Sequence, residues 1–163
     1  PIYKASFKQS AAKYNLDWHL LAAIGYQESY LKPTSVSPTG VRGLMMLTSS
    51  TAQAMGVTNR TDPIQSIQGG AKYYDLMLDQ YENVPYPDRN WYALVAYNMG
   101  PGAVNQIQKR IKAQGKNPNQ WVNLYDYLQR NQARNGRYKQ ALQYVTRIRT
   151  YLEHLKTSNR IEV

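Results

Sequence analysis

The sequence has no cysteine, one phenylalanine, and half as many acidic residues as basic ones. Without cysteine the fold contains no disulfide bond, and cysteine usage gives no indication of the compartment. No apolar run approaches the roughly 20 residues that a transmembrane helix needs. The chain begins at Pro1 without an initiator methionine and without a signal-peptide pattern. We therefore expect a processed protein or an excised domain, in which targeting information cannot be read.

The composition is that of a folded protein with a strong positive charge. The chain has 163 residues, of which 42% are hydrophobic and 18% charged, and this length suits one compact domain covering residues 1–163. Its net charge is +10, which favours a polyanionic partner such as nucleic acid, an anionic membrane face or an acidic cell-wall polymer. Tyrosine occurs 15 times, and its ring with a polar tip suits clefts that bind sugars or bases.

Apolar residues recur with the period of helices, and we find no convincing series of strands. Asp17 and the pair Asp62-Pro63 are helix start signals, and Ser50 with Gln53 forms a capping pair. These patterns predict an all-α protein with helices over residues 2–14, 18–30, 49–55, 63–81, 89–98, 103–113, 118–129 and 138–155. The helix over 63–81 should bury one face, formed by Ile64, Ile67, Ala71, Tyr74 and Leu78. The helix over 89–98 is apolar on all sides, which is typical of a central, buried helix.

Glu28 is the first candidate for chemistry. It follows Leu21 and Ile24 at helical spacing and precedes Leu31, so the four residues should share the core face of one helix. Burial disfavours a charged carboxylate and raises its pKa, which is what a general acid near neutral pH requires. The alternative is a glutamate at a helix end that reaches solvent or caps another element.

Two further segments have the residue types of a binding cleft. The loop over residues 37–47 contains Ser37 and two glycines, and it ends in four consecutive apolar residues that a solvated turn would not favour. Tyr97 and Asn98 end the apolar helix, where a hydroxyl and an amide need hydrogen-bonding partners. Those partners are either a bound polar ligand or carbonyl groups at the helix end.

Together these segments resemble the signature motifs of the soluble-lytic-transglycosylase-type domain, a family of lysozyme-like enzymes that cleave peptidoglycan. The motifs are Glu28-Ser29, the segment Ser37 to Met46, and Ala96 to Gly102, and Tyr144-Val145 is similar to the family's late tyrosine motif. The resemblance covers residues 17–153 in the family's order. It implies a goose-type lysozyme/lytic transglycosylase helical fold with a substrate cleft.

One departure from the common family pattern narrows the resemblance. The family form reads G-L-M-Q, and this chain has Met46 in place of the glutamine. That substitution and the segment Arg60 to Tyr74 resemble the branch called membrane-bound lytic murein transglycosylase F. Met46 has no side-chain amide with which to make the sugar contact of the usual glutamine.

The resemblance also implies residue roles. Glu28 is expected to act first as acid and then as base, and Ser37 to contact a glycan N-acetyl group or to orient Glu28. Tyr97 and Tyr144 are expected to place hydroxyl groups near the reacting centre. The remaining members of the expected substrate site are Met45 and Met46, as an apolar floor, and Asn98, as support for the helix end. No metal and no cofactor is expected, and His19 and His154 are assigned surface or packing roles.

The expected reaction breaks the bond between N-acetylmuramic acid and N-acetylglucosamine without water and leaves 1,6-anhydromuramoyl ends. The alternatives are a lysozyme-type hydrolase, which needs a positioned water and a second carboxylate, and a non-catalytic peptidoglycan-binding module. A nucleic-acid binder is disfavoured because the basic residues are scattered. The resemblance further implies a monomer in the periplasm, an amino-terminal regulatory domain in the full-length protein, and attachment of that protein to the outer membrane.

Overall fold

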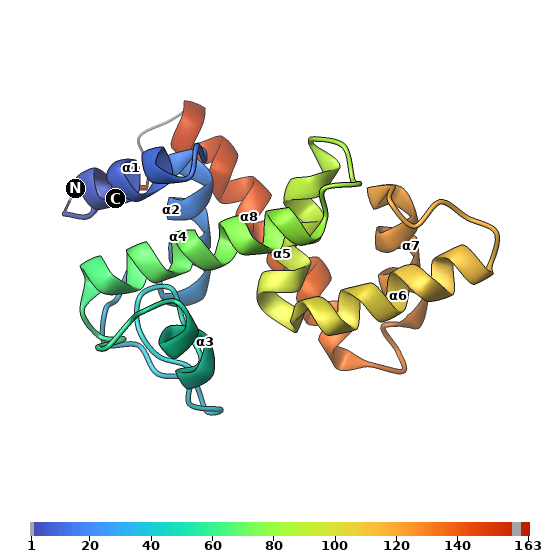
Figure 1. The fold of residues 1–163 in the computed structure, drawn as a ribbon, viewed down its shortest axis with the longest axis horizontal. Coiled ribbons are helices and arrows are strands. Elements are labelled where there is room, and N and C mark those ends of the chain that lie inside the picture. Colours follow the sequence, from blue (N-terminus) through green and yellow to red (C-terminus); the bar gives the residue numbers. More distant parts are fainter. Residues whose placement is uncertain (1, 158–160) are drawn as a thin grey trace. The chain divides into compact units, whose positions relative to one another are not determined.

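The computed structural model of the chain describes residues 2–157 and 161–163. Its described residues form helices joined by loops, and the only extended pairing among them is two isolated β-bridges within residues 36–47. The all-α prediction is confirmed (Figure 1). The helices in chain order are α1 (Lys4–Lys13), α2 (Trp18–Ser29), α3 (Ser49–Ala54), α4 (Pro63–Gln80), α5 (Asp88–Met99), α6 (Pro101–Ala113), α7 (Trp121–Asn131) and α8 (Gly136–Thr157). None of the described helices has the length and apolarity needed to cross a bilayer.

The chain folds into two compact units. The first contains the described residues of Pro1–Asp75 and Arg147–Val163, and the second contains Leu76–Thr146. The division falls inside α4 and inside α8, so each of these helices contributes one part to each unit. The assignment of residues 1–163 to a single domain stays a prediction.

The first unit is built around α2 and the apolar end of the long loop that follows it. Phe7 of α1, Leu21 and Ile24 of α2, and Leu44 of the loop are all fully buried. Gly25 makes this packing possible, because a Cβ on that residue would lie 2.9 Å from Leu44 and 3.1 Å from the Phe7 ring. Each fully buried apolar side chain of this size contributes roughly 1.5–3 kcal/mol, so the core fixes α2 and the loop together.

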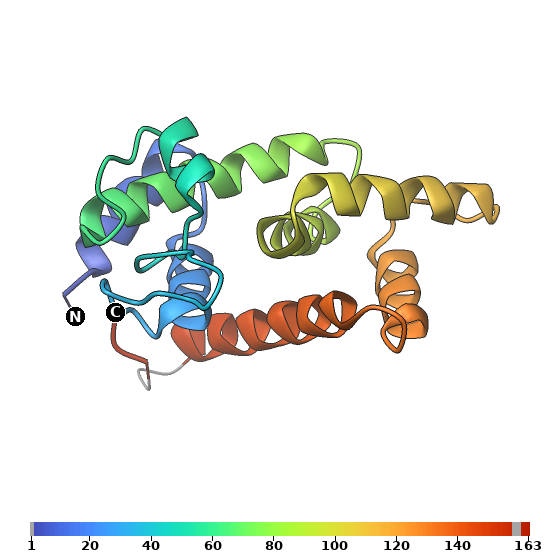
Figure 2. The same ribbon diagram turned by 90° about the horizontal axis from the view of Figure 1, so that it is seen from below.

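The second unit is built around α5. Every residue from Trp91 to Tyr97 is buried, which confirms the expectation of a central helix that is apolar on all sides. The Tyr92 hydroxyl donates to the carbonyl oxygens of Pro118 and Gln120 at 2.6 and 2.9 Å, and this ties α5 to the segment that leads into α7. Gly100 then turns the chain into α6, which crosses the view of Figure 2 while α5 is seen almost end-on.

Three local predictions about the helices are wrong. The side chain that caps α3 is Thr48, which accepts from the Thr51 backbone N–H at 3.0 Å, and not the pair Ser50 and Gln53. Ile64 is 53% exposed because it lies in the first turn of α4, before that helix enters the core. The seventh helix begins at Trp121, where the Asp88 carboxylate accepts from the Trp121 backbone N–H, and not at Pro118.

Candidate active site

Glu28 lies in the last turn of α2. The helix begins at the predicted cap, where the Asp17 carboxylate accepts from the His19 backbone N–H at 3.0 Å. It ends when Tyr30 adopts a left-handed conformation with φ 52°. Because the helix stops at Ser29, Leu31 lies outside it, and the expected face of four helical residues is only partly formed. Leu21 and Ile24 are fully buried, whereas Glu28 is half-buried.

Ser29 fastens the end of α2 to the loop that carries the second motif. This side chain is buried, and its hydroxyl lies 2.6 Å from the Leu44 carbonyl oxygen and 3.1 Å from the Gly25 carbonyl oxygen. The same oxygen accepts from the Lys32 backbone N–H at 3.2 Å. The single hydroxyl proton favours the closer Leu44 carbonyl, so one small side chain contacts three backbone groups at the position next to Glu28.

Met45, the loop residue after Leu44, is held by a contact with α4. The Met45 backbone N–H donates to the hydroxyl of Ser66, which is fully buried, at 2.9 Å. The Met45 side chain is also fully buried and packs where a Cβ on Gly70 would lie 2.7 Å from it. Met45 thus supports the loop from inside the unit, and Met46, which is half-buried, is the methionine with exposed surface.

The tight turn between Arg42 and Leu47 gives the motif its shape. The backbones of these two residues exchange hydrogen bonds of 3.0 and 3.1 Å. Gly43 has φ 92°, and a Cβ there would overlap the Arg60 carbonyl oxygen, so only glycine fits. Met46 also has a positive φ of 51°, which is uncommon for a residue with a side chain.

Arg60 holds this turn from outside. Its guanidinium donates to the Gly40 carbonyl oxygen at 3.0 Å and to the Leu47 carbonyl oxygen at 3.1 Å. The segment 60–74, which resembles one branch of the family, therefore contributes two direct supports to the loop, Arg60 and Ser66.

Ser37 organises the other end of the loop. Its oxygen accepts from the backbone N–H groups of Thr39 and Val41 at 3.3 and 3.2 Å and lies 3.0 Å from the Thr39 hydroxyl. This is a serine turn, in which a side chain replaces a backbone partner. The half-buried Ser37 thus shapes the loop of the first unit, and its contact with a glycan stays a prediction.

The other predicted residues belong to the second unit. Tyr97, in the last turn of α5, is 8% exposed, and the adjacent Asn98 is exposed. Tyr144, on α8, is 4% exposed. Arg137 joins the elements that carry them, because its guanidinium donates to the Met99 carbonyl oxygen at 2.6 Å from the first turn of α8. Two helical turns separate Arg137 from Tyr144 on α8.

Several carboxylates that could serve as a second acid have structural partners. Asp17 caps α2, lies 2.7 Å from His19 Nδ1 and pairs with Lys156 at 3.0 Å. Partial burial raises the pKa of Asp17, but the hydrogen bonds from His19 and Lys156 outweigh it, so that pKa lies below its ordinary value. Asp62 caps α4, and Asp126 pairs with Lys116 and Arg130. No group of three metal-ligating side chains lies close together among the described residues.

Three supporting residues could not be recognised from residue type and spacing in the sequence. Ser29, Ser66 and Arg137 act through contacts with segments 15, 21 and 38 residues away in the chain. A serine near a helix end or in a first turn usually indicates a helix cap, and an exposed arginine usually indicates a solvated charge. Only the Glu28-Ser29 pairing in the family motif indicated that the serine has a role.

A comparison with protein families matches the model described as "Transglycosylase SLT domain" to residues 5–120. Curated relatives include proteins named "Membrane-bound lytic murein transglycosylase F". The one from Stutzerimonas stutzeri is 51% identical over 131 residues, covering 80% of this chain and 27% of the relative. The one from Pseudomonas fluorescens is 54% identical over the same shares of the two chains. A relative from Alkalilimnicola ehrlichii, named with the suffix F 1, is 45% identical over 96% of this chain and 34% of its own length.

Solved structures share the fold. An inactive mutant of lytic transglycosylase Slt from Pseudomonas aeruginosa superposes with a TM-score of 0.73 at 22% identity, covering 99% of this chain and 25% of that one. The 70 kDa soluble lytic transglycosylase from Escherichia coli gives a TM-score of 0.73 at 20% identity, covering 96% of this chain and 25% of that one. The lysozyme-like lytic transglycosylase fold is confirmed. The chain spans about a quarter of the length of the first curated relatives it matches.

Proposed function

Because the chain belongs to the Transglycosylase SLT domain family, we propose that it is the catalytic domain of a peptidoglycan lytic transglycosylase. Its substrate is the bond between N-acetylmuramic acid and N-acetylglucosamine, and its products have 1,6-anhydromuramoyl ends. The observation that carries the proposal is the position of Glu28. It is half-buried in the last turn of α2, and the next residue anchors the second motif.

The proposed reaction uses one carboxyl group twice. Glu28 protonates the glycosidic oxygen, and the substrate's own N-acetyl group attacks the anomeric carbon as the bond to the leaving sugar breaks. The Glu28 carboxylate then removes the proton from the muramoyl O6 hydroxyl, and O6 displaces the N-acetyl oxygen to close the anhydro ring. Protons balance over the cycle, and no water is consumed. Such a residue works best with a pKa near the working pH.

The fixed surroundings of Glu28 support this role. A group that acts as acid and then as base must keep its position through both steps, and small displacements reduce the rate strongly. The Ser29 and Ser66 hydroxyls hold two successive residues of the adjacent loop at 2.6 and 2.9 Å. In this proposal Met46 provides the exposed apolar contact of the loop, with Met45 supporting it.

The second unit supplies the proposed hydroxyl groups. Tyr97 and Tyr144 are largely buried, so their hydroxyls occupy defined positions. We assign them to orienting the sugar, and Asn98 to supporting the end of α5. Ser37 either contacts the N-acetyl group or shapes the loop that does.

The setting of the domain is also part of the proposal. Curated relatives are longer and are named membrane-bound. We therefore propose a cell-envelope enzyme in the periplasm of a Gram-negative bacterium, whose full-length form carries an amino-terminal regulatory domain and an attachment to the outer membrane. The net charge of +10 suits a polymer whose peptide stems carry carboxylates.

Mass spectrometry of the products from purified peptidoglycan tests the function. Anhydromuramoyl ends are expected, and these lack the mass of the water that a hydrolase adds. Glu28→Gln removes the acid and keeps the shape, so turnover should fall by several orders of magnitude, on the scale of about 10²–10⁴ that general acid–base catalysis supplies. Reducing ends in place of anhydro ends would instead identify a lysozyme-type hydrolase.

A matched control separates chemistry from a general effect of lost charge. Glu153 is an exposed glutamate on α8 in the same unit, and Glu153→Gln makes the same chemical change. This variant should cleave normally, and both variants should melt near the parent temperature. Near-normal cleavage by Glu28→Gln would refute the single-acid mechanism.

A further inference from the structure

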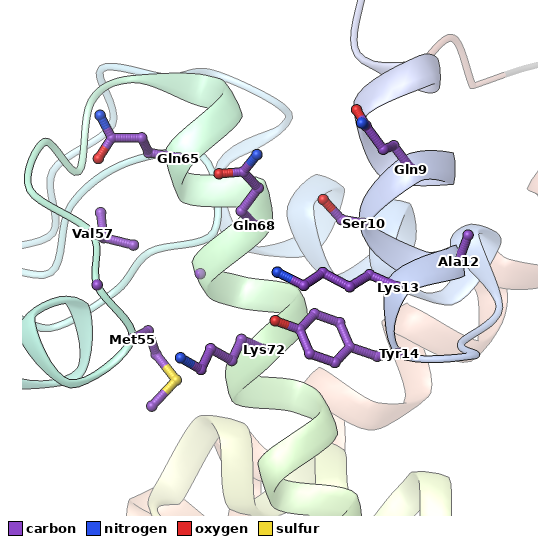
Figure 3. A pocket seen from close by; sticks show the side chains of 12 residues that line it. Gln9, Ser10, Ala12, Lys13, Tyr14, Met55, Val57, Gln65, Gln68 and Lys72 are labelled. Atoms are coloured by element: carbon purple, nitrogen blue, oxygen red, sulfur yellow. The ribbon is translucent and has the colours of Figure 1, made fainter.

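A pocket of about 630 Å³ lies in the first unit, between α1, α4 and the turn after α3. Figure 3 shows Lys13, the last residue of α1, and Tyr14, which follows it, reaching into the pocket, with Gln68 and Lys72 of α4 beside them. The volume falls in the range of sites that bind small organic molecules. None of the predicted site residues lines this pocket, so it is separate from the Glu28 site.

The lining has one sign of charge. It contains the two lysines and no aspartate or glutamate. Neither Lys13 nor Lys72 takes part in any of the ion pairs formed between described residues. The ammonium of Lys13 lies 5.6 Å from the centre of the Tyr14 ring, which orients it. Two cations without a protein counter-charge at one concave surface favour an anionic ligand.

Polar groups with free capacity accompany the two cations. The side-chain amides of Gln9 and Gln68 and the hydroxyl of Tyr14 form no hydrogen bond with any other described residue. The Gln65 amide, by contrast, is occupied by Thr58, Asn59 and Asp62. The free amides can donate to carboxylate oxygens and accept from amide N–H groups, which is the chemistry that a peptide with carboxylates presents.

The pocket has a rigid wall. Gly69 lines it, and a Cβ on this residue would overlap the Val57 side chain of the opposite segment, so α4 and the turn after α3 approach closely. The same helices hold the Glu28 segment: α1 packs Phe7 near Gly25 of α2, and α4 binds Met45 through Ser66. A ligand bound here is therefore fixed to the structural frame that holds Glu28.

From these observations we propose that the pocket is a second substrate site, which binds the carboxylates of a peptide stem while the glycan is cleaved elsewhere. Lys13 and Lys72 pair with the carboxylates, and Tyr14, Gln9 and Gln68 bind the peptide's polar groups. Lysine suits this task because its ammonium is a point charge on a flexible side chain, which can donate to carboxylates in varied orientations. The proposal rests on the proposed function, since it takes peptidoglycan as the substrate.

Binding of a muramoyl tripeptide to the Glu28→Gln chain tests the site without turnover. Lys13→Gln combined with Lys72→Gln should weaken binding at least about tenfold, since two charge-assisted contacts are lost. Replacing both lysines by arginine should retain binding, because the charges remain. The matched control combines Lys109→Gln with Lys112→Gln, two exposed lysines of α6 in the second unit, and should bind as the parent does.

The ligand supplies a second control. The same muramoyl peptide with its carboxylates amidated should bind weakly to the parent chain and equally weakly to the Lys13/Lys72 variant. Unchanged affinity in that variant, or equal affinity for the amidated peptide, would overturn the proposal. The proposal would also be overturned if adding the peptide shifted no NMR signals of Lys13, Tyr14 and Lys72. Tighter binding of inorganic phosphate or of anionic vesicles than of the peptide would overturn it as well.

Cleavage assays separate this proposal from the proposed function. The Lys13/Lys72 variant should cleave peptide-free glycan strands at the parent rate and peptide-bearing strands more slowly. If the variant cleaved both substrates at the parent rate, the second site would be refuted and the transglycosylase function would stand. Failure of the parent chain to release anhydromuramoyl products from either substrate would refute the function itself.

Discussion

The hydroxyl of Ser29 lies 2.6 Å from the carbonyl oxygen of Leu44 and donates a hydrogen bond to it. This bond joins the residue after Glu28 to the apolar end of the loop 15 residues further along the chain. Both ends of the bond are buried, so water cannot replace it. This hydroxyl group therefore makes a direct polar link between the end of α2 and the loop, in addition to the packing of Leu44 in the core.

Removing that hydroxyl should loosen the loop. Ser29→Ala leaves the buried Leu44 carbonyl without its short hydrogen bond, which should reduce the free energy of unfolding by about 1–3 kcal/mol. Urea denaturation measures the change, and turnover should fall as well if the loop positions the substrate. The control is Ser35→Ala in the same loop, because the Ser35 hydroxyl bonds to no described residue. This substitution should leave stability unchanged. Equal stabilities of the two variants would show that the Ser29 bond contributes nothing.

Gly43 should be less replaceable than Gly40, although both have positive φ, 92° and 86°. A Cβ on Gly40 meets nothing within 4 Å, so Gly40→Ala should cost only about 1–2 kcal/mol for the left-handed conformation. A Cβ on Gly43 would overlap the Arg60 carbonyl oxygen. Gly43→Ala should therefore cost about 1–3 kcal/mol more than Gly40→Ala, because the packed turn must shift. Thermal melts of the two variants test the difference, and similar melting temperatures would contradict it.

Tyr97→Phe should separate catalysis from stability. The change removes a hydroxyl and keeps the buried ring, so the melting temperature should stay close to that of the parent. If the hydroxyl contacts the substrate, kcat/KM should fall by about tenfold to a hundredfold, as expected for one hydrogen bond to a reacting complex. Tyr86→Phe, which alters an exposed ring in the same unit, is the control and should leave cleavage unchanged. An unchanged rate in Tyr97→Phe would exclude Tyr97 from the site.

Asp17 should make stability depend on pH in the acid range. Its folded pKa lies below the unfolded value of about 3.9, so its contribution is complete above that pH and is lost as pH falls through the folded pKa. Asp17→Asn keeps a good helix cap and loses the pairing with Lys156. Parent and variant should therefore differ in melting temperature at neutral pH and converge well below about pH 4. The control is Asp79→Asn, at an exposed carboxylate, whose difference in melting temperature from the parent should not shrink in this way as pH falls. A difference between Asp17→Asn and the parent that stayed constant with pH would contradict the role assigned to Asp17.

The sequence predicted those features that depend on local periodicity and on end signals. The Asp17 and Asp62 caps and the buried α5 follow from residues within one or two turns of each other, and the structure confirms them. The cap of α3 was misassigned because Thr48, Ser50 and Thr51 all suit the position, and only the backbone geometry selects Thr48. The predicted burial of Ile64 is wrong because periodicity indicates which face of a helix is apolar, and not where along its length the helix enters the core.

The candidate site was predictable in a different way. Spacing alone indicates a buried carboxylate at Glu28, which the structure shows to be half-buried, and only the ordered motifs of a family indicate its use. The supports from Ser29, Ser66 and Arg137 could not be predicted, because each acts across a chain separation that one sequence does not connect. The left-handed conformation of Met46 was equally hidden, since methionine has no preference for positive φ.

The unit that bears Glu28 is completed by a segment far from Glu28 in the sequence. The Lys156 ammonium lies 3.0 Å from the Asp17 carboxylate, and the centres of the Tyr151 and Tyr26 rings are 4.7 Å apart. Val163 is buried. During synthesis, Glu28 precedes Arg147–Val163, so its unit can close only after that segment has been made, whereas Leu76–Thr146 is already complete by then. A chain shortened to the family match at residue 120 would keep Glu28 and its loop yet lack this closing segment. The order of segments in the chain thus places the completion of the unit around the proposed acid after the completion of the unit inserted within it.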